Sequence, residues 1–239
     1  MEIQAISYNH APVASEMVQR VNTVSETRAT VRGYSGGHPK VMETCDLFLD
    51  QLEHLRSAGE MTPLQIERVL DGVRFSAEKH QYQKRKGKED LPYIIHPIGV
   101  AHTLATLALV RDPDILIGAL LHDTVEDTNT SFAEIGERFG PCVEGLVREV
   151  TDDKSLPKEE RKRLQIVNAP HKSLGAALIK LSDKLYNLRS LLTDIPVGWS
   201  TERVDAYFDW SKQVIDGLPP VNGALKEAVD AEIASHQKK

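Results

Sequence analysis

The most apolar part of the chain runs directly into the sequence Leu120-Leu121-His122-Asp123-Thr124-Val125-Glu126-Asp127-Thr128. Burial of one histidine and three acids in such surroundings is costly unless a metal ion or hydrogen bonds compensate their charges. On a helix, His122 and Glu126 would lie one turn apart, as would Asp123 and Asp127. The stretch therefore indicates two candidate metal ligands beside two further carboxylates.

Two other segments place polar residues in apolar surroundings. The first is Pro92-Tyr93-Ile94-Ile95-His96-Pro97, in which a histidine precedes a proline and is expected to be held in an extended direction. The second is Leu181-Ser182-Asp183-Lys184-Leu185-Tyr186-Asn187-Leu188, which places Asp183 and Asn187 one turn apart on an apolar helix. A buried acid and a buried amide both need partners.

Together, His96, His122, Asp123 and Asp183 make a set of two histidines and two carboxylates. Such a set suits Mn²⁺, Fe²⁺ or Zn²⁺ better than Ca²⁺ or Mg²⁺, which prefer an all-oxygen shell. Because no thiolate is included, a catalytic ion with open positions for water is favoured over a structural zinc. The alternative is a purely structural role, since a His-Asp dipeptide by itself also arises by chance.

The remaining pattern predicts an all-α fold. Apolar residues recur at spacings of three and four, and the alternation typical of strands is absent. We expect helices over residues 41–59, 62–84, 97–110, 113–124, 131–140, 158–168, 174–193, 200–217 and 223–236. Thr62 before Pro63, and Ser131 with Glu134 three residues later, are typical helix starts. The glycine-rich phosphate loops of Rossmann and P-loop proteins do not occur.

Composition changes divide the chain into three expected parts. Residues 1–40 lack a sustained period and end in a run rich in glycine, so they are predicted to form a mobile N-terminal tail and linker. Residues 41–60 carry an apolar stripe at helical spacing and are predicted to be an added helix. Residues 61–239 hold the candidate ligands and are predicted to be the catalytic domain.

Composition also bounds the functional class. With 239 residues, 41% hydrophobic and 27% charged, the chain is typical of a folded globular protein. Its longest apolar run is far shorter than the ~18 residues of a membrane span, and we expect no membrane partner. A net charge of −6 argues against nucleic acid as a partner. Two distant cysteines favour free thiols and a cytoplasmic location; a homo-oligomer is left open.

The ordered motifs resemble a known family. Arg85-Lys86, the His96 segment, the stretch His122 to Thr128 and the run Asp183 to Arg189 look like the hydrolase domain of bacterial RelA/SpoT enzymes, which are HD-domain phosphohydrolases. Further stretches are still more similar to the stand-alone metazoan small alarmone hydrolases; these are residues 149–158, 169–171 and 198–200. The similarity covers about residues 62–217.

This resemblance implies a fold, a metal and a reaction. The fold would be an HD-domain helical bundle with one Mn²⁺ at its centre, held by His96, His122, Asp123 and Asp183. The reaction would be hydrolysis of the 3′-pyrophosphate of guanosine tetraphosphate or pentaphosphate, giving GDP or GTP and pyrophosphate. Glu126 and Asp127 would orient or activate the attacking water.

The resemblance further implies that Arg85 and Asn187 contact the nucleotide. The run Lys84 to Lys88 could support this, because an arginine can stack on a base while lysines such as Lys86 neutralise phosphates. Further candidate substrate contacts, for which a solvated helix face or core packing is the alternative, are Lys158, Tyr186 and Tyr207. Gly87 departs from the bacterial pattern, which often has a serine there.

Two other functions compete with the alarmone hydrolase. A site that holds a ribose 3′-phosphate beside a purine could also accept the 2′-phosphate of NADPH, and would then release NADH and inorganic phosphate. The chain could instead be a catalytically silent module that binds nucleotide. Retention of Glu126, Asp127 and all four candidate ligands argues against a silent module.

Overall fold

The computed structural model describes residues 14–237, and the regular structure of these residues is helical. An isolated antiparallel bridge joins Lys84 and Pro92. The elements are α1 (Ala14–Tyr34), α2 (Pro39–Ser57), α3 (Pro63–Lys79), α4 (Ile95–Thr106), α5 (Pro113–Leu121), α6 (Thr124–Asp127), α7 (Phe132–Phe139), α8 (Pro141–Val150), α9 (Lys158–Asn168), the 3₁₀ helix η1 (Ala169–His171), α10 (Leu174–Thr193), α11 (Thr201–Gly217) and α12 (Gly223–Gln237). The all-α prediction is confirmed. Over this part of the chain, no helix is both long and apolar enough to cross a bilayer.

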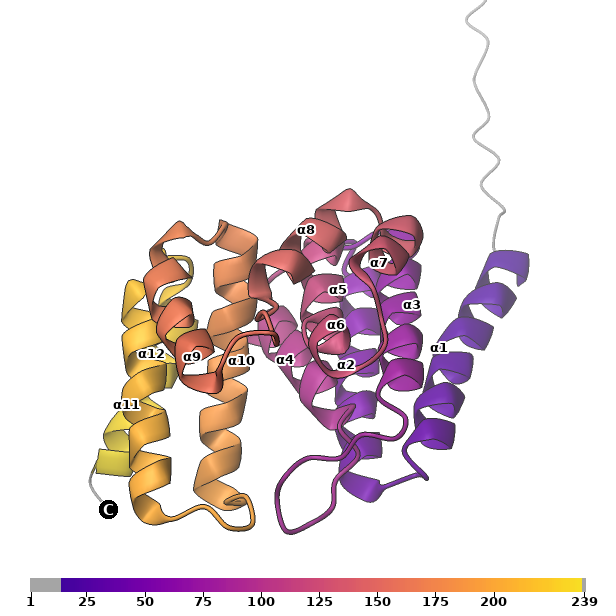
Figure 1. The fold of residues 1–239 in the computed structure, drawn as a ribbon. Coiled ribbons are helices and arrows are strands. Elements are labelled where there is room, and N and C mark those ends of the chain that lie inside the picture. The colour runs from indigo at the N-terminus through magenta and orange to yellow at the C-terminus, as the bar shows by residue number, and fades with distance from the viewer. Residues whose placement is uncertain (1–13, 238–239) are drawn as a thin grey trace, which may run out of the picture.

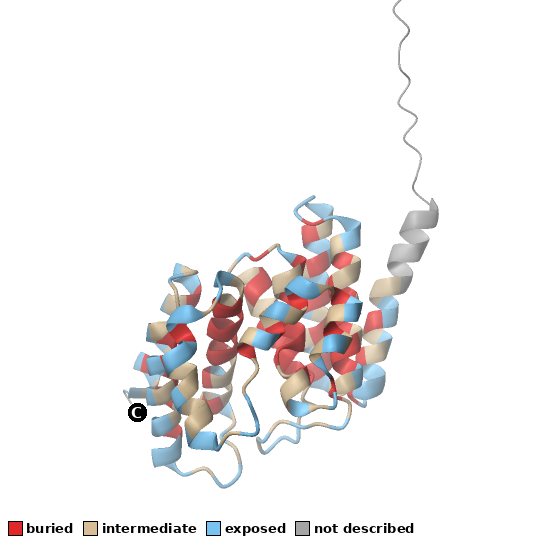
Figure 2. Ribbon diagram, turned by 45° about the horizontal axis from the view of Figure 1, so that its top comes forward, coloured by how far each residue is buried: buried red, intermediate tan, exposed pale blue. Residues whose placement is uncertain are grey.

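Helix α10 lies in the middle of the bundle (Figure 1). It packs against α4, α5 and α8 on one side and against α11 and α12 on the other, and α9 in turn packs on α11. Buried residues gather where these helices face one another, and exposed ones cover the outer faces (Figure 2). Burial of a leucine or isoleucine side chain contributes roughly 1.5–3 kcal/mol, so this shared core holds α4, α5 and α10 in fixed relative positions.

Two predicted helix starts are present, with one difference. Thr62 forms a full capping box with Gln65, in which each side chain accepts from the other residue's backbone N–H. Ser131 Oγ accepts from the Glu134 N–H at 3.1 Å, as predicted. The Glu134 carboxylate, however, pairs with Lys79 of α3 at 2.6 Å, so it ties two helices together instead of closing a box.

The prediction of a mobile tail and linker over residues 1–40 is wrong for residues 14–34, which form α1; residues 1–13 lie outside the described part. Helix α1 packs on α3 through a narrow stripe at spacings of three and four, formed by Val24, Thr27 and Val31. Arg74 of α3 donates to Thr27 Oγ1 at 2.9 Å. The stripe is too narrow and too polar to stand out in a sequence that is otherwise hydrophilic.

Helix α2 corresponds to the added helix expected over residues 41–60. Its buried face packs on α4, and Phe48 and Leu52 belong to the same hydrophobic cluster as Ile98 and Leu104. The helix thus shares the core of the bundle. A functional division of the chain at residue 61 stays a prediction.

Candidate metal centre and nucleotide pocket

Helix α5 ends where the His-Asp dipeptide begins, instead of continuing to residue 124 as the sequence suggests. Side chains donate hydrogen bonds to the last backbone carbonyls of the helix. The three bonds, each 2.7 Å long, run from His122 Nδ1 to Ala119 O, from Ser76 Oγ to Leu120 O and from Thr124 Oγ1 to Leu121 O. Because a carbonyl only accepts, Nδ1 of His122 carries a proton, and its Nε2 is the ring atom left to bind a metal once its own proton is displaced.

His96 lies in the first turn of α4, so the expectation of an extended conformation before Pro97 is wrong. Its backbone N–H donates to Tyr93 O at 2.9 Å, and its side chain is buried. Nε2 of His96 lies 3.2 Å from Nε2 of His122. Two imidazole rings from different helices therefore direct the same ring atom at one point.

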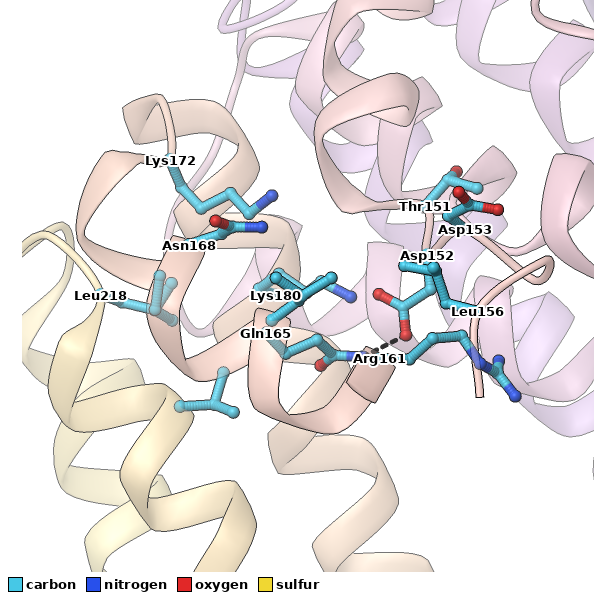
Figure 3. A pocket seen from close by; sticks show the side chains of 13 residues that line it. Thr151, Asp152, Asp153, Leu156, Arg161, Gln165, Asn168, Lys172, Lys180 and Leu218 are labelled. Carbon is cyan, nitrogen blue, oxygen red and sulfur yellow. Dashed lines mark hydrogen bonds between the residues drawn. The ribbon is translucent and has the colours of Figure 1, made fainter. Parts of the chain in front are cut away.

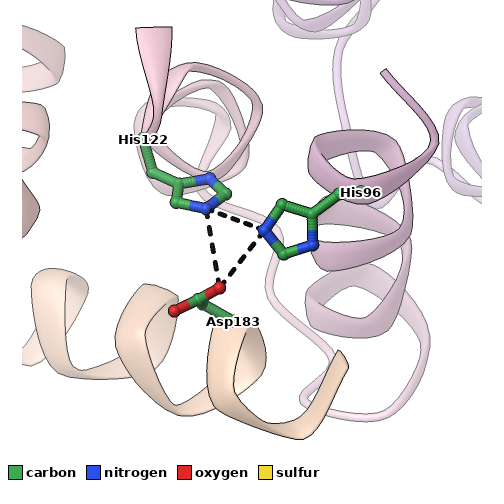
Figure 4. A group of neighbouring side chains, drawn as sticks. All are labelled: His96, His122 and Asp183. Carbon is green, nitrogen blue, oxygen red and sulfur yellow. Dashed lines mark hydrogen bonds and ion pairs between the residues drawn. The ribbon is translucent and has the colours of Figure 1, made fainter. Parts of the chain in front are cut away.

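Two carboxylates complete the cluster, and Figure 4 shows that of Asp183 beside the two imidazole rings. Asp183 Oδ1, on α10, lies 3.2 Å from His96 Nε2 and 3.7 Å from His122 Nε2, and these three atoms lie within 4.8 Å of one another. Asp123 Oδ2 approaches the same two nitrogens to 3.4 and 3.1 Å. It also accepts a hydrogen bond from the Tyr93 hydroxyl at 2.6 Å. The structure thus brings together all four side chains that the sequence singled out.

The electrostatics of this cluster favour a bound cation. Burial lowers the pKa of His122, but the Asp123 and Asp183 carboxylates outweigh it and raise the pKa to about 10. Burial also opposes ionisation of both acids, yet His122 beside Asp123 and Lys184 beside Asp183 hold the pKa of each carboxyl well below its usual range. Two carboxylates and two imidazoles around one point fit a divalent metal, which supplies positive charge without a proton.

Glu126 and Asp127 follow the metal cluster on the short helix α6. Glu126 accepts from the backbone N–H of Asp152 at 3.3 Å and faces Arg161 at 3.5 Å. Burial and the nearby Asp123 carboxylate raise the pKa of Glu126. Asp127 accepts from Gln83 Nε2 at 2.8 Å and pairs with Lys154. Both carboxylates are therefore held by neighbouring segments, and Glu126 has the raised pKa of a group suited to proton transfer.

A cavity of about 460 Å³ opens beside the metal cluster and extends to Asp127. Five of the six candidate substrate contacts line it; they are Arg85, Lys86, Tyr186, Asn187 and Tyr207. Lys158 does not, because it lies at the exposed start of α9. The cavity combines cations with aromatic faces, which is the chemistry that recognises a base and its phosphates.

A chain of hydrogen bonds connects this cavity to the metal cluster. Asn187 Nδ2 donates to Asp183 Oδ1 at 2.6 Å, and Arg85 Nη2 donates to Asn187 Oδ1 at 2.8 Å. The segment that carries Arg85 folds back on itself, since its backbone N–H donates to Leu91 O at 2.8 Å. The Arg85 guanidinium also lies 5.4 Å from the Tyr93 ring centre. One side chain, Asn187, thus fixes a metal-ligand candidate and a cation of the cavity together.

Several residues that support the site were not singled out from the sequence. Tyr93 holds Asp123, and Lys184, which is buried, lies 3.5 Å from Asp183 Oδ2 and 4.3 Å from the Trp210 ring centre. Lys184 directly follows a candidate ligand on an apolar helix, and a charge in that place is a signal that sequence alone provides. Arg161, in contrast, belongs to a cationic run that is equally typical of a solvated helix face, and it reaches Glu126 across 35 positions.

Comparisons with known proteins agree with this geometry. A family model for the HD domain matches residues 72–203. A MESH1 protein of Xenopus tropicalis is 53% identical over 162 residues, which cover 68% of this chain and 90% of the relative. The Homo sapiens MESH1 protein is 55% identical over 161 residues, covering 67% and 90%. Both are named guanosine-3′,5′-bis(diphosphate) 3′-pyrophosphohydrolase.

A solved structure of a metazoan orthologue of SpoT superposes with a TM-score of 0.69 at 48% identity, covering 70% of this chain and 94% of that one. That protein is described as hydrolysing ppGpp. The sequence and fold comparisons thus agree. The chain belongs to the HD-domain family and, within it, to the group of MESH1 proteins.

Proposed function

We propose that the chain hydrolyses the 3′-pyrophosphate of guanosine tetraphosphate and pentaphosphate, releasing pyrophosphate and leaving GDP or GTP. The observation that carries the proposal is the bond chain from Asp183 through Asn187 to Arg85, which sets a phosphate-reacting centre directly beside a base-binding cavity. The MESH1 relatives named for this activity support it.

The reaction needs a metal, and the donor set determines which ions fit. A divalent ion held by His96, His122, Asp123 and Asp183 would lower the pKa of a water molecule and polarise a phosphoryl oxygen. Two nitrogen and two oxygen donors without sulfur suit Mn²⁺, and also Fe²⁺ or Zn²⁺. We infer one Mn²⁺ per chain, to be checked by elemental analysis of purified protein and by the ion that restores activity after chelation.

The chain's own side chains have distinct roles in this reaction. Glu126 accepts the proton of the attacking water, because burial and the Asp123 carboxylate raise its pKa. Asp127, held by Gln83 and Lys154, orients that water at the edge of the cavity. Arg85, with Tyr186 and Tyr207 in the same cavity, contacts the nucleoside, and Lys86 contacts its phosphates. Lys158 stays a predicted contact, at an exposed position.

The direct test is to incubate the purified protein with Mn²⁺ and guanosine tetraphosphate and to identify the products by phosphorus NMR. Pyrophosphate and GDP are expected. His122→Ala and Asp183→Ala should lose activity, and Glu126→Gln should lower kcat by roughly 10²–10⁴-fold. His171→Ala, at an exposed position outside the cavity, is the matched control and should leave the rate unchanged. Full activity in either ligand variant would refute the assigned centre.

The same assay decides between the competing functions. Release of inorganic phosphate and NADH from NADPH, without turnover of guanosine tetraphosphate, would move the function to cofactor dephosphorylation. Nucleotide binding without turnover of either compound in the presence of Mn²⁺ would identify a silent binding module.

We also infer a cytoplasmic location. Cys45 is buried, Cys142 is exposed, and both are free thiols, as suits a reducing compartment. Fractionation of cells that express a tagged chain tests this, and recovery from an oxidising compartment would contradict it.

A further inference from the structure

A second cavity, of about 200 Å³, is lined by Asp152 and Arg161, the two residues that contact Glu126 (Figure 3). It is lined by residues of α9, η1, α10 and α11 and of the segment that begins at Thr151, and it shares no lining residue with the nucleotide cavity. Its volume is several times the ~30 Å³ that one water molecule occupies in the liquid. The cavity can therefore hold a small ion together with water.

Two lysines extend into this cavity (Figure 3). Lys180 is only 8% exposed, and among residues 14–237 its ammonium has no hydrogen bond or ion pair within the usual distances. Lys172 donates to the backbone carbonyl of Glu149 and has no ion pair within the same part of the chain. Burial lowers the pKa of Lys172, the charge of Lys180 lowers it further, and the Glu149 and Asp152 carboxylates offset this only in part. Two ammonium groups thus repel one another in a partly dry space.

The opposite wall carries acids that already have partners of their own. Asp152 Oδ2 accepts from Gln165 Nε2 at 2.6 Å, while the Asp152 backbone N–H holds Glu126. Asp153 Oδ1 accepts from the backbone N–H of Ser155 at 2.9 Å. Arg161, which faces Glu126, keeps a buried Nε without a partner in the described chain. Among residues 14–237 the two ammonium groups therefore form no direct ion pair, and the nearby carboxylates of Asp152 and Asp153 are engaged by other donors.

We propose that this cavity is a binding site for a phosphoryl anion, inorganic phosphate or pyrophosphate, held between Lys172 and Lys180. Buried cations in proteins are normally paired, and an ammonium group is a common phosphate binder. The position along α10 fits the assignment, because Lys180, Asp183 and Asn187 follow one another at spacings of three and four and so share a face. Only the choice of pyrophosphate, the expected product, rests on the proposed function.

The test is calorimetric titration of the full purified chain with inorganic phosphate and, separately, with pyrophosphate, at constant ionic strength and without nucleotide. One anion per chain is expected. Lys172→Gln and Lys180→Gln should each weaken binding about tenfold or more, because each removes a charged hydrogen bond. Lys212→Gln, the same charge change on an exposed face of α11, is the control and should bind as the parent does.

Equal affinities in the parent and in both lysine variants would overturn the proposal, as would an equal loss in Lys212→Gln. Pyrophosphate binding that survives both variants but disappears in His122→Ala would place the anion at the metal cluster and also overturn it. Thermal unfolding followed by circular dichroism shows whether Lys180→Gln folds. If it does not, Lys172→Gln decides alone. The titration measures binding and not turnover, so its result can be interpreted even if the chain does not hydrolyse guanosine tetraphosphate.

Discussion

Gly99 of α4 lies against the ring of Tyr186, and replacement by alanine tests whether this contact shapes the nucleotide cavity. A Cβ at residue 99 would lie 2.1 Å from Cε2 of that ring, about 1.3 Å short of the 3.4 Å at which ordinary contact begins. Overpacking of this kind costs roughly 1–3 kcal/mol, and the better helix propensity of alanine returns about 0.5–1 kcal/mol. We therefore expect Gly99→Ala to lower the free energy of unfolding by about 0.5–2 kcal/mol.

The ring can relieve the clash by moving into the cavity, so KM for guanosine tetraphosphate should rise more than kcat falls. Urea unfolding and steady-state kinetics measure the two effects. Gly145→Ala in α8, where a Cβ meets nothing within 4 Å, is the control and should gain about 0.5–1 kcal/mol. In a Tyr186→Ala background the clash is gone, and Gly99→Ala should also stabilise. Equal destabilisation in both backgrounds would refute the reasoning.

Three further predictions concern the frame around the site. Gly87→Ser should raise KM without changing kcat, since a Cβ there would lie 1.7 Å from Asp194 Oδ2 and displace the carboxylate that anchors this loop; an unchanged KM contradicts this. Ser76→Ala should cost about 1–3 kcal/mol in urea unfolding, because it leaves the buried Leu120 carbonyl unpaired. Burial opposes ionisation of Asp71, but its arginine partners hold its pKa below the usual value. The Asp71 carboxylate therefore stabilises the folded protein above about pH 4, and this contribution is lost on further acidification. When the pH is lowered from 5 to 3, the free energy of unfolding of Asp71→Asn should accordingly fall by less than that of the parent.

The sequence was sufficient to pick out the candidate metal ligands, because each is a polar residue close to apolar neighbours in the chain. His122 directly follows an apolar helix and Asp183 lies within one, and a buried polar group in such a place must have a partner in the core. The local backbone was predicted less well. The sequence could not show that Ser76, 44 positions away, takes a carbonyl of α5 and helps to end that helix before the His-Asp pair.

The contacts that sequence reasoning missed are those with no local contrast. Arg161 lies in a highly charged helix, where a binding role and a solvated face look alike in the sequence, and only the fold brings it to Glu126. Helix α1 was not predicted for the same reason, since its buried stripe includes a threonine, a polar residue that nevertheless packs on α3. Local sequence patterns therefore reveal buried polar side chains that need a partner. The side chains that act as their partners become visible only in the tertiary structure.

The position of α10 explains how one element can organise the whole site. Lys180, Asp183 and Asn187 lie on one face, and at a rise of 1.5 Å per residue the first and last are about 10 Å apart along the axis. In that order the helix reaches the second cavity, the metal cluster and the nucleotide cavity. A nucleotide with a 3′-pyrophosphate has the same order of parts, with the terminal phosphate first, then the reacting phosphorus bonded to the 3′ oxygen, and then the nucleoside. A shift of α10 along its axis would displace all three contacts together, which is why its central position in the core matters for the reaction.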